Sequence, residues 1–235
     1  MLSVSRIAAG YSRGSRVLDG LSLEIEAGEA VALLGRNGMG KSTLLRTITG
    51  HLKPSSGDIR FKGEPIASLP PYRIARAGIG YVPQGREVFA EFTVEENLQM
   101  GVLGKPTLGR SVPAWALDLF PILGERTSQR AGTMSGGQQQ QLAIMRALVG
   151  EPDLLLLDEP SEGIQPSIVH DIGVALKSYA EERGLALLLV EQNIDLVILL
   201  ASRAAFLENG TIVEEIRDIG RLQSDAGLIH RYLSV

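Results

Sequence analysis

The sequence predicts an α/β fold built on a parallel sheet, and two kinds of segment lead to this prediction. Three compact apolar runs have the length and composition of strands buried on both faces: Glu29–Leu34, Asp153–Leu157 and Leu185–Val190. Helix-like segments at Lys41–Thr49 and Gln138–Val149 are each followed by a glycine, a residue that commonly ends helices. Strands that alternate with helices along a chain are typical of parallel sheets.

Turn signals predict additional antiparallel strands. Asp58–Phe61 has the pattern of a strand that ends in a turn at Lys62-Gly63. Further along, Ala204–Leu207 and Thr211–Glu214 flank the dipeptide Asn209-Gly210, which is a strong signal for a β-hairpin.

The segment from Arg86 to Thr133 has a different character. Val94–Met100 and Ala114–Leu123 look helical, whereas Gly101–Pro113 is loop-like and has little strand character. We therefore interpret the segment as a helical insertion in an α/β core. The predicted organisation is one domain over 1–235, with its core at 1–85 and 134–235 and a helical subdomain at 86–133.

Composition narrows the class of protein. Of the 235 residues, 44% are apolar and 21% charged, so we expect an ordinary globular core. A formal net charge of −4 argues against a nucleic-acid binder that works by bulk electrostatics. The absence of cysteine excludes disulfides and fits a reducing compartment. No signal peptide is visible and no apolar stretch reaches roughly 18 residues, so we expect that the chain does not span a membrane; if it works at one, it is docked there.

A glycine-rich motif follows the first apolar run and matches G-x-x-x-x-G-K-[ST]: Gly35, Arg36, Asn37, Gly38, Met39, Gly40, Lys41 and Ser42. A predicted strand precedes the motif and a predicted helix follows it, which is the context in which this pattern binds phosphate. Glycines let backbone N–H groups point at anionic oxygens, and the helix N-terminus adds partial positive charge. We expect Lys41 to reach the β- and γ-phosphates and Ser42 to ligate Mg²⁺. The alternative, a glycine-rich turn followed by lysine and serine by chance, is disfavoured by the flanking elements.

Two adjacent carboxylates, Asp158 and Glu159, follow the leucine run of a predicted buried strand. Charges at such a place need a partner, and Mg²⁺ bound at Ser42 would supply one for Asp158. Glu159 lies one residue further on, where it can act as the general base on a water molecule. The alternative is that both residues cap the loop before Pro160.

Four further motifs occur in order: Tyr81-Val82-Pro83-Gln84, Met134-Ser135-Gly136-Gly137-Gln138, Ser161-Glu162-Gly163-Ile164-Gln165-Pro166 and Leu189-Val190-Glu191-Gln192-Asn193. Together with the glycine-rich motif, they resemble the ATP-binding-cassette ATPase family over essentially the whole chain. The resemblance implies a P-loop NTPase (RecA-like) core with an antiparallel β subdomain and an inserted α-helical subdomain. It also implies ATP and Mg²⁺ as ligands, and ATP hydrolysis as the reaction.

The resemblance assigns roles to individual residues. In such ATPases two cassettes meet head to tail, and each ATP lies between the phosphate loop of one and the signature of the other, here Ser135, Gly136, Gly137 and Gln138. Tyr11 resembles the aromatic residue that stacks on adenine, with Val17 nearby; an exposed tyrosine in a turn is the alternative. The implied sets are Tyr11, Val17, Gly35 to Ser42, Thr43 and Gln84 for the nucleotide, Ser42, Gln84 and Asp158 for Mg²⁺, and Lys41, Glu159 and Gln192 for catalysis.

Two positions depart from the family pattern. Gln192 stands where a histidine is usual; its amide can hydrogen-bond a γ-phosphate but cannot become cationic near neutral pH. We therefore expect slower or less tightly coupled hydrolysis, not its loss. Gln165 stands where many cassettes have aspartate, which puts the usual contact of this loop across the dimer in doubt.

The departures, together with a short chain that has no additional C-terminal domain, resemble importer ATPases of the branched-chain amino-acid class. Within that class, the stretch Pro160–Ser167 looks most like the urea and short-chain amide branch. The expected function is to energise uptake of urea or short-chain amides, with amino-acid import as the alternative. Two rival interpretations are a soluble cassette protein acting on nucleic acid or ribosomes and a non-catalytic regulatory cassette.

This resemblance also implies partners. We expect two transmembrane permease subunits, a second cassette subunit in a heterodimer or homodimer, an indirect link to an extracytoplasmic solute-binding protein, and no nucleic acid. The chain would sit on the cytoplasmic face of the cell membrane. Residues Arg86–Met100 are expected to line a groove for a permease helix; alternatively, the acidic residues Glu91, Glu95 and Glu96 mark a solvated helix start.

Overall fold

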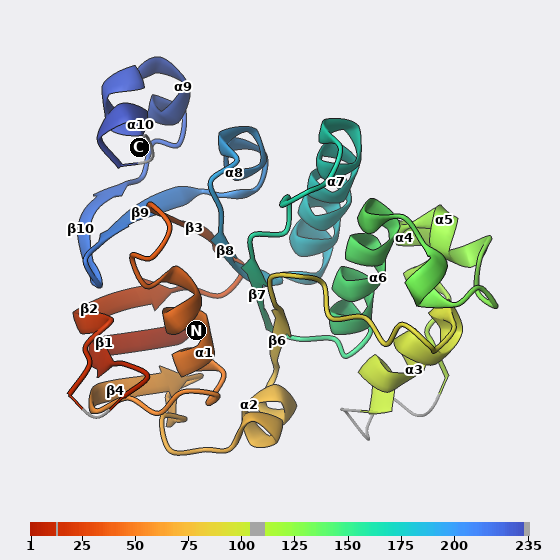
Figure 1. The fold of residues 1–235 in the computed structure, drawn as a ribbon, viewed down its shortest axis with the longest axis horizontal. Coiled ribbons are helices and arrows are strands. Elements are labelled where there is room, and N and C mark those ends of the chain that lie inside the picture. Colours follow the sequence, from red (N-terminus) through yellow and green to blue (C-terminus); the bar gives the residue numbers. More distant parts are fainter. Residues whose placement is uncertain (13, 104–110, 233–235) are drawn as a thin grey trace.

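A six-stranded sheet forms the centre of the computed structural model, which describes residues 1–12, 14–103 and 111–232 (Figure 1). Its strand order is β10 (Thr211–Ile216), β9 (Arg203–Glu208), β3 (Ala30–Leu34), β8 (Ala186–Val190), β7 (Leu154–Asp158) and β6 (Ile79–Val82). The neighbours from β9 to β6 are all parallel, and β10 adds an antiparallel edge. The predicted α/β fold is confirmed.

The three apolar runs of the sequence form β3, β7 and β8, and every residue of β7 and β8 is buried. Each strand begins one residue later than predicted. β7 also continues one residue further, because Asp158 still pairs with Val190 of β8. Asp158 is therefore the last residue of a fully buried strand rather than the first residue of a loop.

An antiparallel sheet lies beside the central one, in the order β2 (Leu18–Ile25), β1 (Leu2–Ala9), β4 (Ser56–Phe61) and β5 (Glu64–Pro65). The predicted turns are present at Lys62-Gly63 and Asn209-Gly210, and all four residues have positive φ. Such turns match the twist of a hairpin. The strands β1 and β2 have no individual counterpart in the sequence prediction; only the family resemblance implies this sheet.

Eleven helical elements complete the described part of the chain: α1 (Lys41–Ile48), α2 (Pro71–Ala77), α3 (Val94–Leu103), α4 (Trp115–Leu119), α5 (Pro121–Gly124), η2 (Ala131–Thr133), α6 (Gly136–Leu148), α7 (Pro166–Arg183), α8 (Ile194–Leu200), α9 (Arg221–Ser224) and α10 (Ala226–Tyr232). The helices expected after the glycine-rich motif and after the signature are α1 and α6. In the described residues, no helix has both the length and the apolar character needed to cross a bilayer.

Two predictions for the insertion are wrong in detail. Helix α3 runs through Gly101 to Leu103, into the expected loop; residues 104–110 of that loop lie outside the described residues. Gly101 is tolerated there because it packs directly on α6, where a Cβ would lie 2.0 Å from the carbonyl oxygen of Arg146. The expected helix Ala114–Leu123 is instead two helices, since Phe120 is extended before Pro121, which cannot continue a helix.

The central sheet has an apolar core on each face. Leu155 and Leu157 of β7 pack with α3, α6 and α7, whereas Leu154 and Leu156 pack with α1 and the antiparallel sheet. In Figure 1 the antiparallel sheet and α1 lie to the left and the helices α3 to α6 to the right. Because β3, β7 and β8 are parallel neighbours, their carboxyl ends meet at one edge of the sheet.

Candidate functional site

The loop between β3 and α1 curls around its own lysine. Gly38 and Gly40 have φ of 82° and 108°, a left-handed conformation that only glycine adopts readily. The Lys41 ammonium donates hydrogen bonds to the carbonyl oxygens of Gly35 at 2.7 Å and Arg36 at 3.1 Å. The loop therefore forms a cradle with a cation inside it, which suits an anionic ligand.

Lys41 is only 5% exposed. Burial lowers the pKa of Lys41, and the nearby carboxylates Glu159, Asp158 and Glu191 oppose that shift. The closest of them is Glu159, whose Oε1 lies 3.6 Å from the ammonium. The cradle and the carboxyl end of β7 thus lie next to each other.

Asp158 meets the cradle through Ser42. The Ser42 hydroxyl donates to Asp158 Oδ1 at 3.0 Å, and the Tyr81 hydroxyl donates to Oδ2 at 3.4 Å. Burial raises the pKa of Asp158, and these two hydrogen bonds partly oppose the shift. A hydroxyl and a carboxylate are oxygen donors of the kind that Mg²⁺ prefers, so the residues present fit this ion.

The sequence reasoning assigned no role to Tyr81. Its position becomes evident only in the structure, where Tyr81 of β6 pairs with Leu156 of β7, two residues before Asp158. Glu162 was missed in the same way: it lines the cavity beside the cradle and accepts a 2.9 Å hydrogen bond from the Gln84 side chain.

Glu159 accepts hydrogen bonds from side chains of two other segments. Gln84 Nε2 donates to its Oε2 and Gln192 Nε2 to its Oε1, both at 3.2 Å. Gln192 Nε2 also donates to Asn37 Oδ1 at 2.7 Å. The backbone of Glu159 is left-handed with φ of 48°, a strained conformation for a non-glycine residue. A carboxylate fixed in this way, with an exposed edge of 13%, is suited to accept a proton from water.

A cavity of about 420 Å³ opens over these groups and is lined by Tyr11, Val17, Asn37, Gly38, Gly40, Lys41, Ser42, Thr43, Gln84, Glu159 and Glu162. Tyr11 is 58% exposed, and its hydroxyl lies 3.3 Å from Thr43 Oγ1. Among the described residues, no aromatic or cation–π contact involves its ring, which is accessible for stacking. The side chains of Arg36 and Met39 turn elsewhere, toward the carbonyl of Arg231 and the N–H of Asn209.

The signature residues lie apart from this cavity. Ser135 caps α6: its hydroxyl accepts from Gln138 N at 3.4 Å, and Gln138 Oε1 accepts from Ser135 N at 3.1 Å. None of the signature residues Ser135 to Gln138 is among the residues that line the cavity. Within one chain, the structure therefore does not bring the signature to the cradle.

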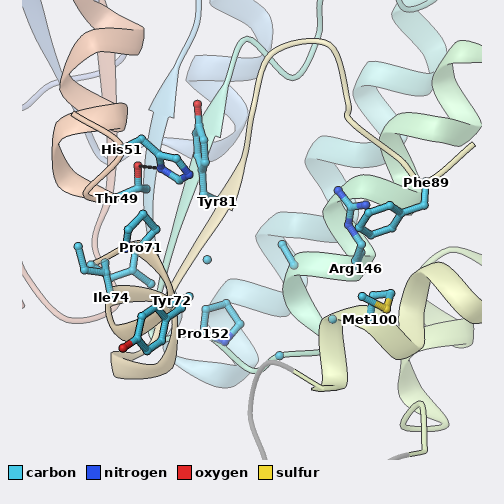
Figure 2. A pocket seen from close by; sticks show the side chains of 16 residues that line it. Thr49, His51, Pro71, Tyr72, Ile74, Tyr81, Phe89, Met100, Arg146 and Pro152 are labelled. Atoms are coloured by element: carbon cyan, nitrogen blue, oxygen red, sulfur yellow. Dashed lines mark hydrogen bonds between the residues drawn. The ribbon is translucent and has the colours of Figure 1, made fainter. Parts of the chain in front are cut away.

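A second hollow of about 480 Å³ lies between the central sheet and the helices α3 and α6. Figure 2 shows His51 and Tyr81 on one side of it and Phe89, Met100 and Arg146 on the other. The Arg146 guanidinium lies 5.0 Å from the centre of the Phe89 ring, and its Nη1 is buried without a hydrogen-bond partner among the described residues. The hollow is mainly apolar, with this cation in its wall.

The substitution Asp158→Asn should stabilise the nucleotide-free protein. A carboxyl whose folded pKa lies above its unfolded value contributes stability at low pH that is lost as the pH rises through the folded pKa, so the Asp158 carboxyl is destabilising at pH 7.5. We expect Tm to rise in the variant, by about 2–4 °C for each kcal/mol relieved in a domain of this size. Differential scanning fluorimetry with and without MgATP would test this. MgATP should raise the Tm of the parent and not that of Asp158→Asn; a lower Tm for the nucleotide-free variant would contradict the argument.

Comparisons with known proteins agree with this geometry. The family model described as ABC transporter matches residues 18–162. The high-affinity branched-chain amino acid transport ATP-binding protein BraG of Pseudomonas aeruginosa is 48% identical over 91% of each chain. A crystal structure of a nucleotide-free ATP-binding cassette from an ABC transporter superposes with a TM-score of 0.84 at 28% identity, over 97% of both chains.

One further solved structure bears on assembly. The dimeric structure of a post-hydrolysis state of the cassette MJ0796, bound to ADP and Pi, has a TM-score of 0.83 and 25% identity, over 92% of this chain and 98% of that one. The geometry of the cradle and its carboxylates agrees with the family match and with the similar proteins, which cover nearly the whole chain. The chain belongs to the ABC transporter family, as an ATP-binding subunit of the kind that hydrolyses ATP.

Proposed function

We propose that this chain is the ATPase subunit of an importer for amino acids of the branched-chain type. The observation that carries the ATPase part is the position of Glu159, which lies 3.6 Å from the cradle lysine and is held by Gln84 and Gln192. The import part is supported by the similarity to BraG, which is named for branched-chain amino acid transport.

In the proposed site, Lys41 and the backbone of Gly35 to Gly40 bind the phosphates of ATP. Ser42, Gln84 and Asp158 hold Mg²⁺, which when bound neutralises phosphate charge and orients the transferred group. Glu159 accepts the proton of the attacking water. Gln192 donates its amide toward the same place, and Tyr11 with Val17 borders the adenine.

The complete site requires a second cassette. Ser135 to Gln138 present a helix N-terminus and small residues that can meet a γ-phosphate, but they do so away from their own cradle. The dimeric cassette MJ0796 supports a paired arrangement. We propose a heterodimer with a sister ATPase, and the homodimer is the alternative outcome of a mass measurement.

The second hollow is the proposed docking groove for a permease helix. Its wall includes Phe89 and Met100, which are 43% and 41% exposed, and Arg146, whose Nη1 has no hydrogen-bond partner within the described ranges. The buried Asn97 of α3 ties the loop at Phe89 to this helix through hydrogen bonds of its side-chain amide. The acidic residues Glu95 and Glu96 belong to the exposed first turn of α3, where Glu96 Oε2 accepts from Thr93 N at 2.7 Å. The acidic first turn is thus compatible with a solvated helix start, and the proposed groove uses other residues of the segment. Two permease subunits would hold the chain on the cytoplasmic face of the membrane, with helical residues 86–133 as one side of the groove.

The substitution Met100→Glu should separate docking from hydrolysis. A carboxylate at this site would place charge in an apolar groove, so co-purification with permeases should be lost while the ATPase rate of the isolated chain stays at the parent value. Val174→Glu is the matched control, because Val174 on α7 is an apolar residue with an exposure of 48%, close to the 41% of Met100, and it lies outside the groove. Equal permease recovery for Met100→Glu and Val174→Glu would contradict the docking proposal.

The proposed function has a direct test. The tagged chain is purified from native membranes in mild detergent, phosphate release is measured, and co-purifying chains are identified by mass spectrometry. ATP hydrolysis with two permeases and a second cassette supports the importer. Ribosomal or DNA-repair proteins without a permease would favour the soluble cassette, and ATP binding without phosphate release would favour the regulatory cassette.

The transported solute can be identified by measuring uptake into vesicles that contain the purified assembly. The resemblance of Pro160–Ser167 to the urea and short-chain amide branch keeps these solutes as a second candidate cargo. Uptake of labelled leucine but not of urea or acetamide would support the amino-acid proposal. The reverse result would favour the amide branch.

A further inference from the structure

Glu191 is a buried carboxylate directly after β8, and it is only 2% exposed. Three backbone N–H groups donate to it: Ser161 N to Oε1 at 2.8 Å, and Gln192 N and Asn193 N to Oε2 at 2.8 and 2.9 Å. Burying a carboxylate is costly unless its oxygens are hydrogen-bonded, and backbone donors to an ionised oxygen are among the stronger hydrogen bonds. The side chain therefore joins two loops at the edge of the sheet.

The first loop carries Glu159. Its N–H donates to the carbonyl oxygen of Val190 at 2.9 Å, and two residues later Ser161 N donates to Glu191. Pro160 between them has no N–H to offer. The strained left-handed backbone of Glu159 thus lies beside two attachments to the end of β8, and strain of this kind persists only where the surroundings over-determine it.

The second loop carries Gln192. Glu191 accepts from the N–H of Gln192 itself and of Asn193, and Asn193 Oδ1 in turn caps α8 by accepting from Leu196 N at 3.2 Å. The backbone from which the Gln192 amide reaches Asn37 and Glu159 is consequently fixed at the same carboxylate.

We propose that Glu191 is a positioning residue for hydrolysis, which sets the relative placement of the Glu159 carboxylate and the Gln192 amide. The proposal rests on the proposed function, because it assigns Glu191 to the hydrolytic step and not to ATP binding. Glu191 is not among the residues that line the cavity, so it acts through the two loops. A merely structural carboxylate would affect folding stability and leave the hydrolytic step of the folded protein intact.

The test uses Glu191→Gln in the full-length chain. The amide keeps the shape but turns an N–H toward backbone donors, which removes at least one of the three hydrogen bonds. We expect kcat to fall about 10- to 100-fold, the range for partners that orient a reacting group from outside the site. The Kd for ATP should stay within about twofold, since the cradle and Ser42 are untouched.

Glu29→Gln is the matched control. Glu29 is a partly buried carboxylate with a side chain 20% exposed, and it forms an ion pair at 2.6 Å with Arg203 of β9, away from the cradle. The variant should lower Tm and leave kcat at the parent value. If Glu191→Gln at comparable Tm loss also kept the parent kcat, or weakened ATP binding in proportion to kcat, the positioning role would be overturned.

A second variant tests the proposal if Glu191→Gln folds poorly. Glu191→Asp retains the buried charge but withdraws it by one methylene from at least one donor, so kcat should again fall while Kd holds; an unchanged kcat overturns the proposal. The parent and Glu159→Gln are measured in parallel. A parent that releases no phosphate refutes the proposed function itself, whereas an active parent and an inactive Glu159→Gln leave only the Glu191 inference under test.

Discussion

Replacing Glu159 with glutamine is expected to lower kcat by about 10²–10³, the cost of removing one group that acts on the transition state. Glutamine keeps the size of the side chain and can still meet Gln84 and Gln192, so the loop should keep its shape. It cannot accept the proton of water. The measurement is steady-state phosphate release, with ATP affinity determined separately by a fluorescent nucleotide.

The same variant should reveal the partner cassette. ATP that binds but is not hydrolysed would hold two chains together, so light scattering should show a dimer with Glu159→Gln, ATP and Mg²⁺. Glu162→Gln is the control, because Glu162 lines the same cavity and shares the Gln84 amide but forms no ion pair with Lys41 among the described contacts. Near-parent turnover in Glu159→Gln would remove Glu159 from the role of base, and a persistent monomer would count against the paired site.

Replacing Lys41 with alanine is expected to act on binding instead. The ammonium is the only side-chain cation among the described residues that line the cavity. Its loss should weaken ATP binding about 10- to 100-fold, from the roughly 1.5–3 kcal/mol of a hydrogen bond to a charged group. It also leaves the carbonyl oxygens of Gly35 and Arg36 without their donor, and Glu159 without its 3.6 Å partner.

Isothermal titration with MgATP distinguishes the two variants. Lys41→Ala should lose affinity and turnover together, whereas Glu159→Gln should lose turnover alone. Lys53→Ala is the control, since Lys53 is exposed just beyond α1 and does not line the cavity. Parent affinity in Lys41→Ala would show that the backbone of the cradle, and not the lysine, holds the phosphates.

Much of the fold could be predicted from local pattern. Buried parallel strands are short continuous apolar runs, so β3, β7 and β8 were located to within a residue. The strands β1 and β2 are harder, because they carry polar residues on exposed positions and bulges that break the two-residue period. The end of α3 depends on a tertiary contact. The helix continues through Gly101 because this residue packs closely on α6.

The candidate site also combines residues marked by local sequence pattern with residues placed by tertiary contacts. Two short continuous motifs allow their chemistry to be predicted from sequence alone: one contains Lys41 and Ser42, the other Asp158 and Glu159. Tyr81 was missed because its relevance comes from the pairing of β6 with β7, which no single stretch of sequence encodes. The division into a core and a helical subdomain, like the roles of the individual residues, remains a prediction.

Tyr81 connects the proposed docking groove with the proposed Mg²⁺ site. Its ring belongs to the wall of the proposed docking groove, and its hydroxyl bonds to Asp158 in the proposed Mg²⁺ site. One side chain therefore contacts both proposed sites. Thermodynamic linkage requires any coupling free energy between two binding sites to be reciprocal. Whatever factor a docked helix applies to the affinity for MgATP, MgATP must apply to the affinity for the helix. In the proposed importer, Tyr81 would link the docked permease helix to the bound MgATP.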